Sequence, residues 1–104
     1  MRVVKIFQYL QEQKKEFILS KQLLRCGTSV GAMVREAEHS ESRADFIHKM
    51  AIAQKEINET IYWLELLNAT NYFSDKEFKS INADAVELIK IITTIIKSAK
   101  ENNH

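Results

Sequence analysis

Residues 42–71 read SRADFIHKMAIAQKEINETIYWLELLNATN and contain neither proline nor glycine. Seven residues of this stretch recur at alternating steps of four and three: Phe46, Met50, Ala53, Ile57, Thr60, Leu64 and Leu67. This spacing places them on one side of an α-helix of about eight turns, much longer than a typical globular helix. A stripe of that length needs partner helices along all of it. The stretch therefore predicts a helical bundle, but by itself it predicts no biochemical activity.

The composition agrees with one helical domain over residues 1–104. Hydrophobic residues make up 45% and charged residues 28% of the chain, as in globular proteins. Proline is absent and glycine occurs twice, which favours long helices over an all-β fold. The single Cys26 excludes an internal disulfide and fits a reducing cytoplasm. No apolar run is long enough for a signal peptide or a membrane span, so we expect a cytoplasmic protein without a membrane partner.

Three further helices follow from the same periodicity. We expect one over Arg2–Lys15, with Phe17 continuing its buried side, and one from Ser20 as N-cap to His39. Capping-box patterns at Ser42 and Ser74 begin the other two helices, and the tail 101–104 should fray. The buried stripe expected for the last helix is Phe78, Ile81, Ala85, Leu88, Ile92, Ile95 and Ala99. Connections of roughly three to five residues make neighbours antiparallel, so the predicted fold is an all-α, up-down-up-down four-helix bundle.

The 42–71 helix has a second apolar side. At about 100° per residue, Trp63 and Ile52 lie about 100° and 120° from Leu64, and Tyr62 and Leu66 lie nearly opposite it. The core of a four-helix bundle covers only part of a helix circumference. Scattered surface hydrophobes are the simpler explanation. Aromatic side chains gathered on one side nevertheless favour a contact surface, most simply with another copy of the chain.

Two glycines lie one turn apart within the second predicted helix. Gly27 and Gly31 each cost about 1 kcal/mol relative to alanine in a helix interior. We therefore expect close packing of another helix at this point, either inside the bundle or between chains. Cys26 belongs to the buried stripe of the same helix, together with Leu23, Val30, Met33 and Ala37. A small buried hydrophobe is the expected role of this cysteine, rather than a nucleophile.

Candidate metal ligands have the wrong placement. Glu36-x-x-His39 and Asp45-x-x-His48 resemble half-sites of di-iron bundles, but Asp45 and His48 lie away from the predicted core. We expect no metal, no cofactor and no catalytic residue. Carboxylates near the bundle centre, namely Glu36, Glu56 and Glu59, are interpreted as ion-pair partners of Arg25 or Arg35.

The positive charge gathers near the first turn of the chain. The net charge is only +1, which creates no strong field toward nucleic acid. Lys14, Lys15, Lys21 and Arg25 nevertheless surround one predicted connection and are the candidate phosphate-binding residues. An ordinary solvated surface is the simpler interpretation for one chain, but in a ring of copies the patch would repeat and multivalency would strengthen it.

Three runs of the sequence carry a family resemblance. They are CGTSVGAMVREA (26–37), SRADFIHK (42–49) and AQKEINETIYWLELL (53–67). They resemble the signatures of small four-helix-bundle proteins encoded by intervening sequences in bacterial 23S rRNA genes. Met33 stands where many relatives carry asparagine. The family is in turn similar to the accessory protein of diversity-generating retroelements, a basic pentameric barrel that binds nucleic acid and a reverse transcriptase.

The resemblance implies an antiparallel bundle that assembles as a homopentamer, with no catalytic residue. The first functional hypothesis is a non-enzymatic ring that binds RNA or a ribonucleoprotein through its lysine and arginine residues. The alternative is a protein-interaction scaffold with no nucleic-acid role. A metal-dependent enzyme is a third and weaker hypothesis.

Overall fold

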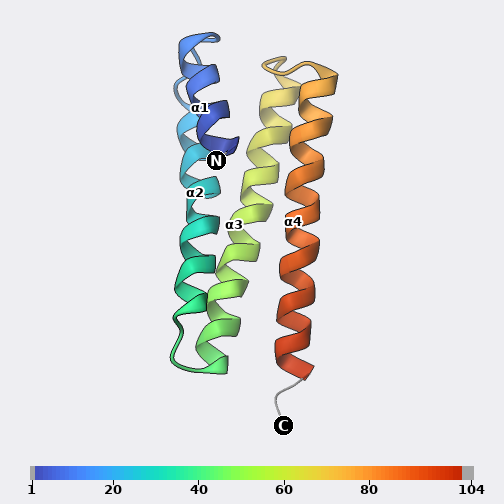
Figure 1. Cartoon of the computed structure of the whole chain (residues 1–104). Coiled ribbons are helices and arrows are strands. Elements are labelled where there is room, and N and C mark those ends of the chain that lie inside the picture. Colours follow the sequence, from blue (N-terminus) through green and yellow to red (C-terminus); the bar gives the residue numbers. More distant parts are fainter. Residues whose placement is uncertain (1, 102–104) are drawn as a thin grey trace.

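The computed structural model describes residues 2–101 and contains four α-helices there. They are α1 (Arg2–Glu12), α2 (Leu19–Glu38), α3 (Arg43–Ala69) and α4 (Asp75–Glu101). Successive helices run in opposite directions in a bundle of 51 × 21 × 17 Å (Figure 1). The predicted all-α, up-down-up-down architecture is therefore confirmed. Of the tail expected to fray, only Glu101 is described, and it is the last residue of α4.

The long helix α3 lies between α2 and α4 and holds them together. Among the described residues, no Cα atom of α2 comes within 8 Å of one in α4, whereas both helices pack closely on α3. The predicted stripe faces these two neighbours. Its most buried members are at most 3% exposed: Met50, Ala53, Ile57, Leu64 and Leu67. Each half of the stripe organises its own hydrophobic cluster, one with Ile92 and Ile96 of α4 and one with Leu10 and Leu23 of α1 and α2.

The buried side of α4 is narrower than the sequence predicted. Leu88 and Ile95 were expected in the core, but both are exposed, as is Ile91. Ile92 is buried as predicted, and Ile96 is buried in place of Ile95. The reason is that α4 packs on α3 alone, so the part of its apolar arc that points toward α2 has no helix against it.

The prediction for the first helix was wrong at its end. Helix α1 stops at Glu12, and Phe17 is 49% exposed rather than buried. Lys15 adopts a left-handed backbone (φ 55°), which turns the chain away from the helix axis. Glu16 then points inward and is only 7% exposed. The connection 13–18 is therefore longer than expected.

Glu16, and not Ser20, caps the start of α2. The Glu16 carboxylate accepts hydrogen bonds from the backbone N–H groups of Ile18 (2.9 Å), Leu19 (2.7 Å) and Ser20 (2.6 Å). Ser20 lies inside the helix, and its hydroxyl donates to the Glu16 carbonyl (2.9 Å). Burial acts to raise the pKa of the Glu16 carboxyl, but the three N–H donors more than offset it, so the pKa is lowered overall. A negative charge at this position also complements the helix dipole.

The other helix ends follow their expected chemistry. Ser74 and Glu77 form a complete capping box, with hydrogen bonds of 2.9 and 3.1 Å. Ser42 accepts a hydrogen bond from the backbone N–H of Asp45 (3.0 Å). Helix α3 ends in a Schellman motif, in which Asn71 takes the left-handed conformation (φ 66°) and the N–H of Tyr72 bonds the carbonyl of Leu67 (3.0 Å).

The two glycines of α2 have different roles. A Cβ atom on Gly27 would lie 2.6 Å from a methyl carbon of Val3, so the missing side chain lets α1 lie directly on α2. This confirms the expected close helix packing at this position. Gly31 is exposed and lines an open groove one turn further along α2.

Replacing Glu16 by glutamine should destabilise the fold in a pH-dependent way. Because the folded-state pKa is lowered, the contribution of the charged carboxylate is present above the unfolded-state pKa and is lost as the pH falls through the folded-state value. At pH 7 we expect Glu16→Gln to cost about 1–3 kcal/mol, since a charged acceptor of three buried or part-buried N–H groups is weakened. Below the folded-state pKa, wild type and variant should converge. Guanidinium unfolding at pH 7 and at progressively lower pH measures this.

Glu12→Gln is the matched control, because Glu12 is an exposed carboxylate just before the same connection. It should change the unfolding free energy by less than about 0.5 kcal/mol. An equal loss of stability in both variants at pH 7 would contradict the capping role of Glu16.

Candidate functional site

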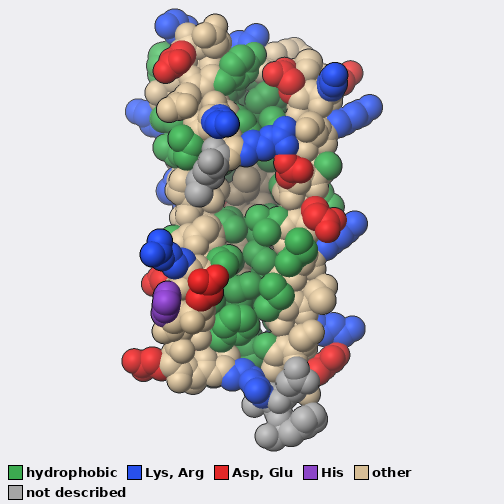
Figure 2. Space-filling view, in the orientation of Figure 1, with side chains coloured by type: hydrophobic (Ala, Val, Ile, Leu, Met, Phe, Trp, Pro, Cys, Tyr) green, Lys and Arg blue, Asp and Glu red, His purple; other side chains and the backbone are tan. Residues whose placement is uncertain are grey.

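An apolar groove runs between α2 and α4, with α3 as its floor. Its cavity has a volume of about 390 Å³ and is lined by Val30, Gly31 and Val34 of α2 and by Ile81 and Leu88 of α4, among others. Figure 2 shows hydrophobic side chains along this face, between the two helices. The short α1 closes one end, where Val3 and Ile6 line the cavity and Arg2 pairs with Asp84 of α4. Nothing in the periodicity of the sequence predicted this groove, because it results from α2 and α4 not meeting.

The predicted interface residues lie on another side of α3. Tyr62 is 56% exposed, and Ile52, Trp63 and Leu66 are half-buried. The rings of Tyr62 and Trp63 meet edge to face, with centroids 5.0 Å apart. Trp63 packs against the cluster around Leu64, and its indole lies close enough to Glu59 to help lower the pKa of that carboxyl. The bundle therefore covers this second apolar side only in part.

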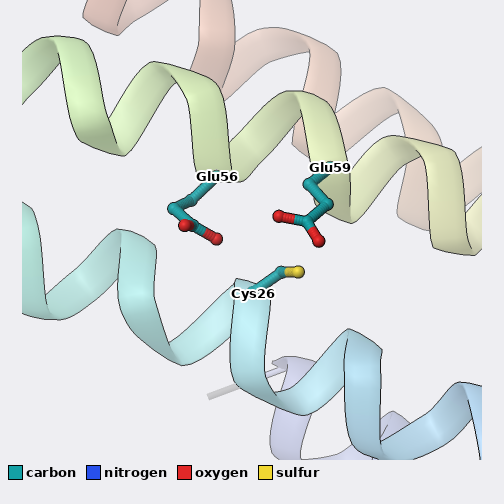
Figure 3. Close-up of side chains that lie close together, drawn as sticks. All are labelled: Cys26, Glu56 and Glu59. Atoms are coloured by element: carbon teal, nitrogen blue, oxygen red, sulfur yellow. The ribbon is translucent and has the colours of Figure 1, made fainter.

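A polar cluster sits between α2 and α3 (Figure 3). The Cys26 thiol faces the carboxylates of Glu56 and Glu59, and their ligand atoms all lie within 4.8 Å of one another. The Arg25 guanidinium contacts Glu59 at 2.6 Å and the Cys26 Sγ at 3.2 Å, and it lies 3.7 Å from Glu56. The predicted pairing of these two glutamates with an arginine is thus confirmed for Arg25.

The electrostatics of this cluster keep the thiol protonated. Burial raises the pKa of Cys26 to about 11, and the neighbouring Glu59 carboxylate adds to the effect. Burial alone would also raise the pKa of Glu59, but the hydrogen bond from Cys26 and the charge of Arg25 lower it overall. Cys26 is fully buried, as predicted, but it is also a hydrogen-bond donor to a carboxylate and not only a small hydrophobe.

The cluster has the donor types of a metal site but the charge balance of an ion pair. Within residues 2–101, Cys26, Glu56 and Glu59 are three potential metal ligands that lie close together, and zinc accepts thiolate and carboxylate donors. Coordination would require the thiol to lose its proton and Arg25 to leave the carboxylates. A protonated thiol is also a poor nucleophile. We therefore assign these residues a structural role in joining α2 to α3.

Three of the four half-site residues line a shallow polar hollow, whereas His48 is exposed outside it. Glu36, His39 and Asp45 line it, together with the cationic side chains Arg35 and Lys49. Lys49 lies 3.8 Å from the Glu36 carboxylate, so Glu36 pairs with a lysine of α3 rather than with an arginine.

The predicted phosphate-binding residues lie at the end of the bundle where α1 joins α2. Lys14 and Lys15 belong to the connection 13–18, and Lys21 lies in the first turn of α2; all three are exposed. Lys14 also lies 5.9 Å from the centre of the Tyr9 ring. Arg25 differs from the lysines, because its guanidinium is engaged by Glu56 and Glu59. The sequence did not reveal that the connection also exposes Phe17 and Ile18.

Comparison with known families gives this arrangement its context. The family model of the 23S rRNA-intervening sequence protein matches residues 1–94. The chain belongs to this family. Among solved structures, it is similar to a protein of unknown function from the S23 ribosomal protein family of Bacteroides thetaiotaomicron VPI-5482. The two share 53% sequence identity with a TM-score of 0.91, over 92% of this chain and 89% of the other.

No curated protein matches this chain. None of the helices in the described part of the chain carries an apolar segment of the length that a bilayer crossing requires.

The Cys26 thiol should resist thiol reagents while the protein is folded. At pH 8 a pKa of about 11 leaves roughly one thiol in a thousand ionised, and the sulfur is also shielded from solvent. Reaction with Ellman's reagent should therefore be slow in buffer and fast in guanidinium. Glu59→Gln should accelerate the native reaction, because it removes a charge that raises the thiol pKa.

Glu65→Gln serves as the control, because Glu65 is exposed on α3 and absent from the cluster. It should leave the rate unchanged. A native thiol that reacts as fast as the unfolded one would show that Cys26 is not held in this environment.

Proposed function

We propose that the protein is a non-enzymatic subunit of a ring of identical chains, which binds RNA or a ribonucleoprotein through its lysine-rich end. The observation that carries the proposal is the uncovered apolar surface of a small bundle belonging to a family named for rRNA intervening sequences. The resemblance seen in the sequence gives five as the number of copies. Similarity to the retroelement accessory protein, also inferred from the sequence, supports the nucleic-acid role.

Self-association is supported by two distinct apolar surfaces. The first is the groove between α2 and α4, beside which Leu88, Ile91 and Ile95 are exposed. The second is the side of α3 that carries Tyr62 and Trp63. A closed ring requires each copy to present two different surfaces, one to each neighbour. Pairing the groove of one copy with the aromatic side of the next satisfies this requirement.

RNA binding is supported by the distribution of charge. The exposed lysines of the α1–α2 end carry no ion pair among the salt bridges of the described residues, whereas Arg25 does. Lys14, Lys15 and Lys21 are thus better placed for phosphate than Arg25, which we assign to the α2–α3 ion pair. A ring would repeat this end in every copy and so raise the affinity for a polyanion by multivalency.

A scaffold without nucleic acid is the second candidate. The net charge of +1 and the apolar character of the groove favour it, since both suit a protein partner. Capture of a protein partner from nuclease-treated lysate, with no RNA binding at low salt, would favour this function over the first.

Filling the groove should dissociate the ring. Gly31→Leu adds a side chain to the groove wall and improves helix propensity, so the monomer fold should survive. Size-exclusion chromatography with light scattering should show an assembly for the wild type and a smaller species for the variant. Ala32→Leu is the control, because Ala32 is the next residue of α2, exposed, and outside the groove. A monomeric wild type at high concentration would contradict self-association.

Removing the lysines should weaken RNA binding and its salt dependence together. For the triple variant Lys14→Ala, Lys15→Ala, Lys21→Ala, we expect the slope of log affinity against log salt to fall by about 1 for each lysine that contacts a phosphate. Gel shifts at several salt concentrations measure this slope. Lys97 and Lys100 are exposed near the end of α4, and their replacement by alanine is the control. Equal losses in both variants would show that binding is not localised to the α1–α2 end.

A further inference from the structure

The α1–α2 connection exposes two large apolar side chains at the end of the bundle. Phe17 is 49% and Ile18 is 76% exposed, and no other large hydrophobic side chain in the described chain is as exposed as Ile18. They are adjacent, and Lys14, Lys15 and Lys21 flank them in the sequence. We call residues 14–18 together with Lys21 the basic tip.

The fold holds this tip in one conformation. The N–H of Gln13 bonds the Tyr9 carbonyl and the N–H of Glu16 bonds the Leu10 carbonyl, both at 2.9 Å. The Glu16 carboxylate accepts hydrogen bonds from the backbone N–H groups of Ile18, Leu19 and Ser20, which holds the backbone on the far side of Phe17. Because Glu16 occupies the inward position, Phe17 and Ile18 are displaced outward. Their exposure is thus built into the hydrogen bonding and is not the result of a loose loop.

The same geometry removes a negative charge from the surface of the tip. Glu16 is buried against the start of α2, where its charge is neutralised by backbone donors and the helix dipole. The exposed charges nearby are the three lysines, with Glu12 before them and Glu77 close enough to Lys14 for that lysine to lower the pKa of its carboxyl. The tip therefore combines an excess of cations with an exposed aromatic ring.

We propose that the basic tip binds single-stranded RNA, with Phe17 stacking on an unpaired base and the lysines contacting the flanking phosphates. This inference rests on the proposed function and names its substrate class. Base–aromatic stacking needs a base face that is free of a stacked neighbour, which a single strand offers and a duplex interior does not. The hydrogen-bonded backbone on both sides of Phe17 keeps the ring at the surface, so the connection need not be ordered on binding. An anionic lipid surface could also accept lysines and apolar side chains, but single-stranded RNA uses the surface already assigned to polyanion binding.

The test compares variants at position 17 on two RNAs. The probe is a fluorescein-labelled, unstructured single-stranded RNA of about 20 nucleotides, free or annealed to its complement, with affinity measured by fluorescence anisotropy. Phe17→Ala should weaken single-strand binding by about five- to a hundredfold, the range expected for the loss of one stacked base. It should leave duplex binding unchanged. Phe17→Trp should retain the affinity, with quenching of the introduced indole, and Phe17→Leu should behave like Phe17→Ala.

Several results would overturn the proposal. Equal binding of single strand and duplex by the wild type, with no effect of Phe17→Ala, would leave the proposed function intact and refute stacking at the tip. Full affinity in Phe17→Leu would replace stacking by a simple apolar contact. No binding of either RNA by the wild type would refute the RNA-binding function itself. Binding to phosphatidylserine vesicles that depends on Phe17, without RNA binding, would assign the tip to a lipid surface.

Folding controls show whether a loss of RNA binding comes from the lost side chain or from a misfolded or dissociated variant. Phe17 is half-exposed, so its variants should keep the wild-type circular dichroism and melting temperature. Light scattering of each variant shows whether the assembly state is unchanged. The triple lysine variant should lose affinity for both RNAs, because phosphate contacts do not distinguish unpaired from paired bases.

Discussion

The whole structure depends on burying a single stripe of α3 against two helices that do not contact each other. Met50, Ala53 and Ile57 pack toward one cluster, and Leu64 and Leu67 toward the other, so the two ends of the bundle share a helix but not a core. Burial of side chains of this size contributes roughly 1.5–3 kcal/mol each for the larger ones. The arrangement leaves an edge, since α2 and α4 are each covered by α3 along one face only.

The groove and the aromatic side of α3, which we propose for self-association, are consequences of that edge. The groove exists because α1 is short and closes only one end of the space between α2 and α4. The half-buried Trp63 and the exposed Tyr62 lie on the flank of α3 that α2 does not fully cover. The polar cluster of Arg25, Cys26 and the two glutamates occupies the boundary between α2 and α3. The protonated thiol and the paired carboxylates there join the two helices through hydrogen bonds and ion pairs.

Local patterning was enough to predict four helices, their order, the α3 stripe and the caps at Ser42 and Ser74, because each of these depends on residues close in the sequence, although the cap predicted at Ser20 was wrong. It failed where a longer-range packing choice decided the outcome. Leu88 and Ile95 fit the helical period of α4 equally well as core or surface, and only the separation of α2 from α4 decides between them. Phe17 also fits the period of the first helix. Its exposure follows from Glu16 turning inward, which no local spacing signals. The sequence predicted that the two glutamates pair with an arginine. Whether this arginine is Arg25 or Arg35 depends on the register between α2 and α3, which the sequence does not give.

The contact between Gly27 and Val3 sets how closely α1 lies on α2. Beyond its packing on α2, α1 shares a hydrophobic cluster with α3 and α4, and Arg2 bonds Ser80 and Asp84 of α4. Exposed ion pairs of this kind contribute less than about 1 kcal/mol. The shape of the closed end of the groove therefore depends on one missing methyl group. A larger residue at position 27 would therefore displace α1 from α2 and lengthen the groove at that end.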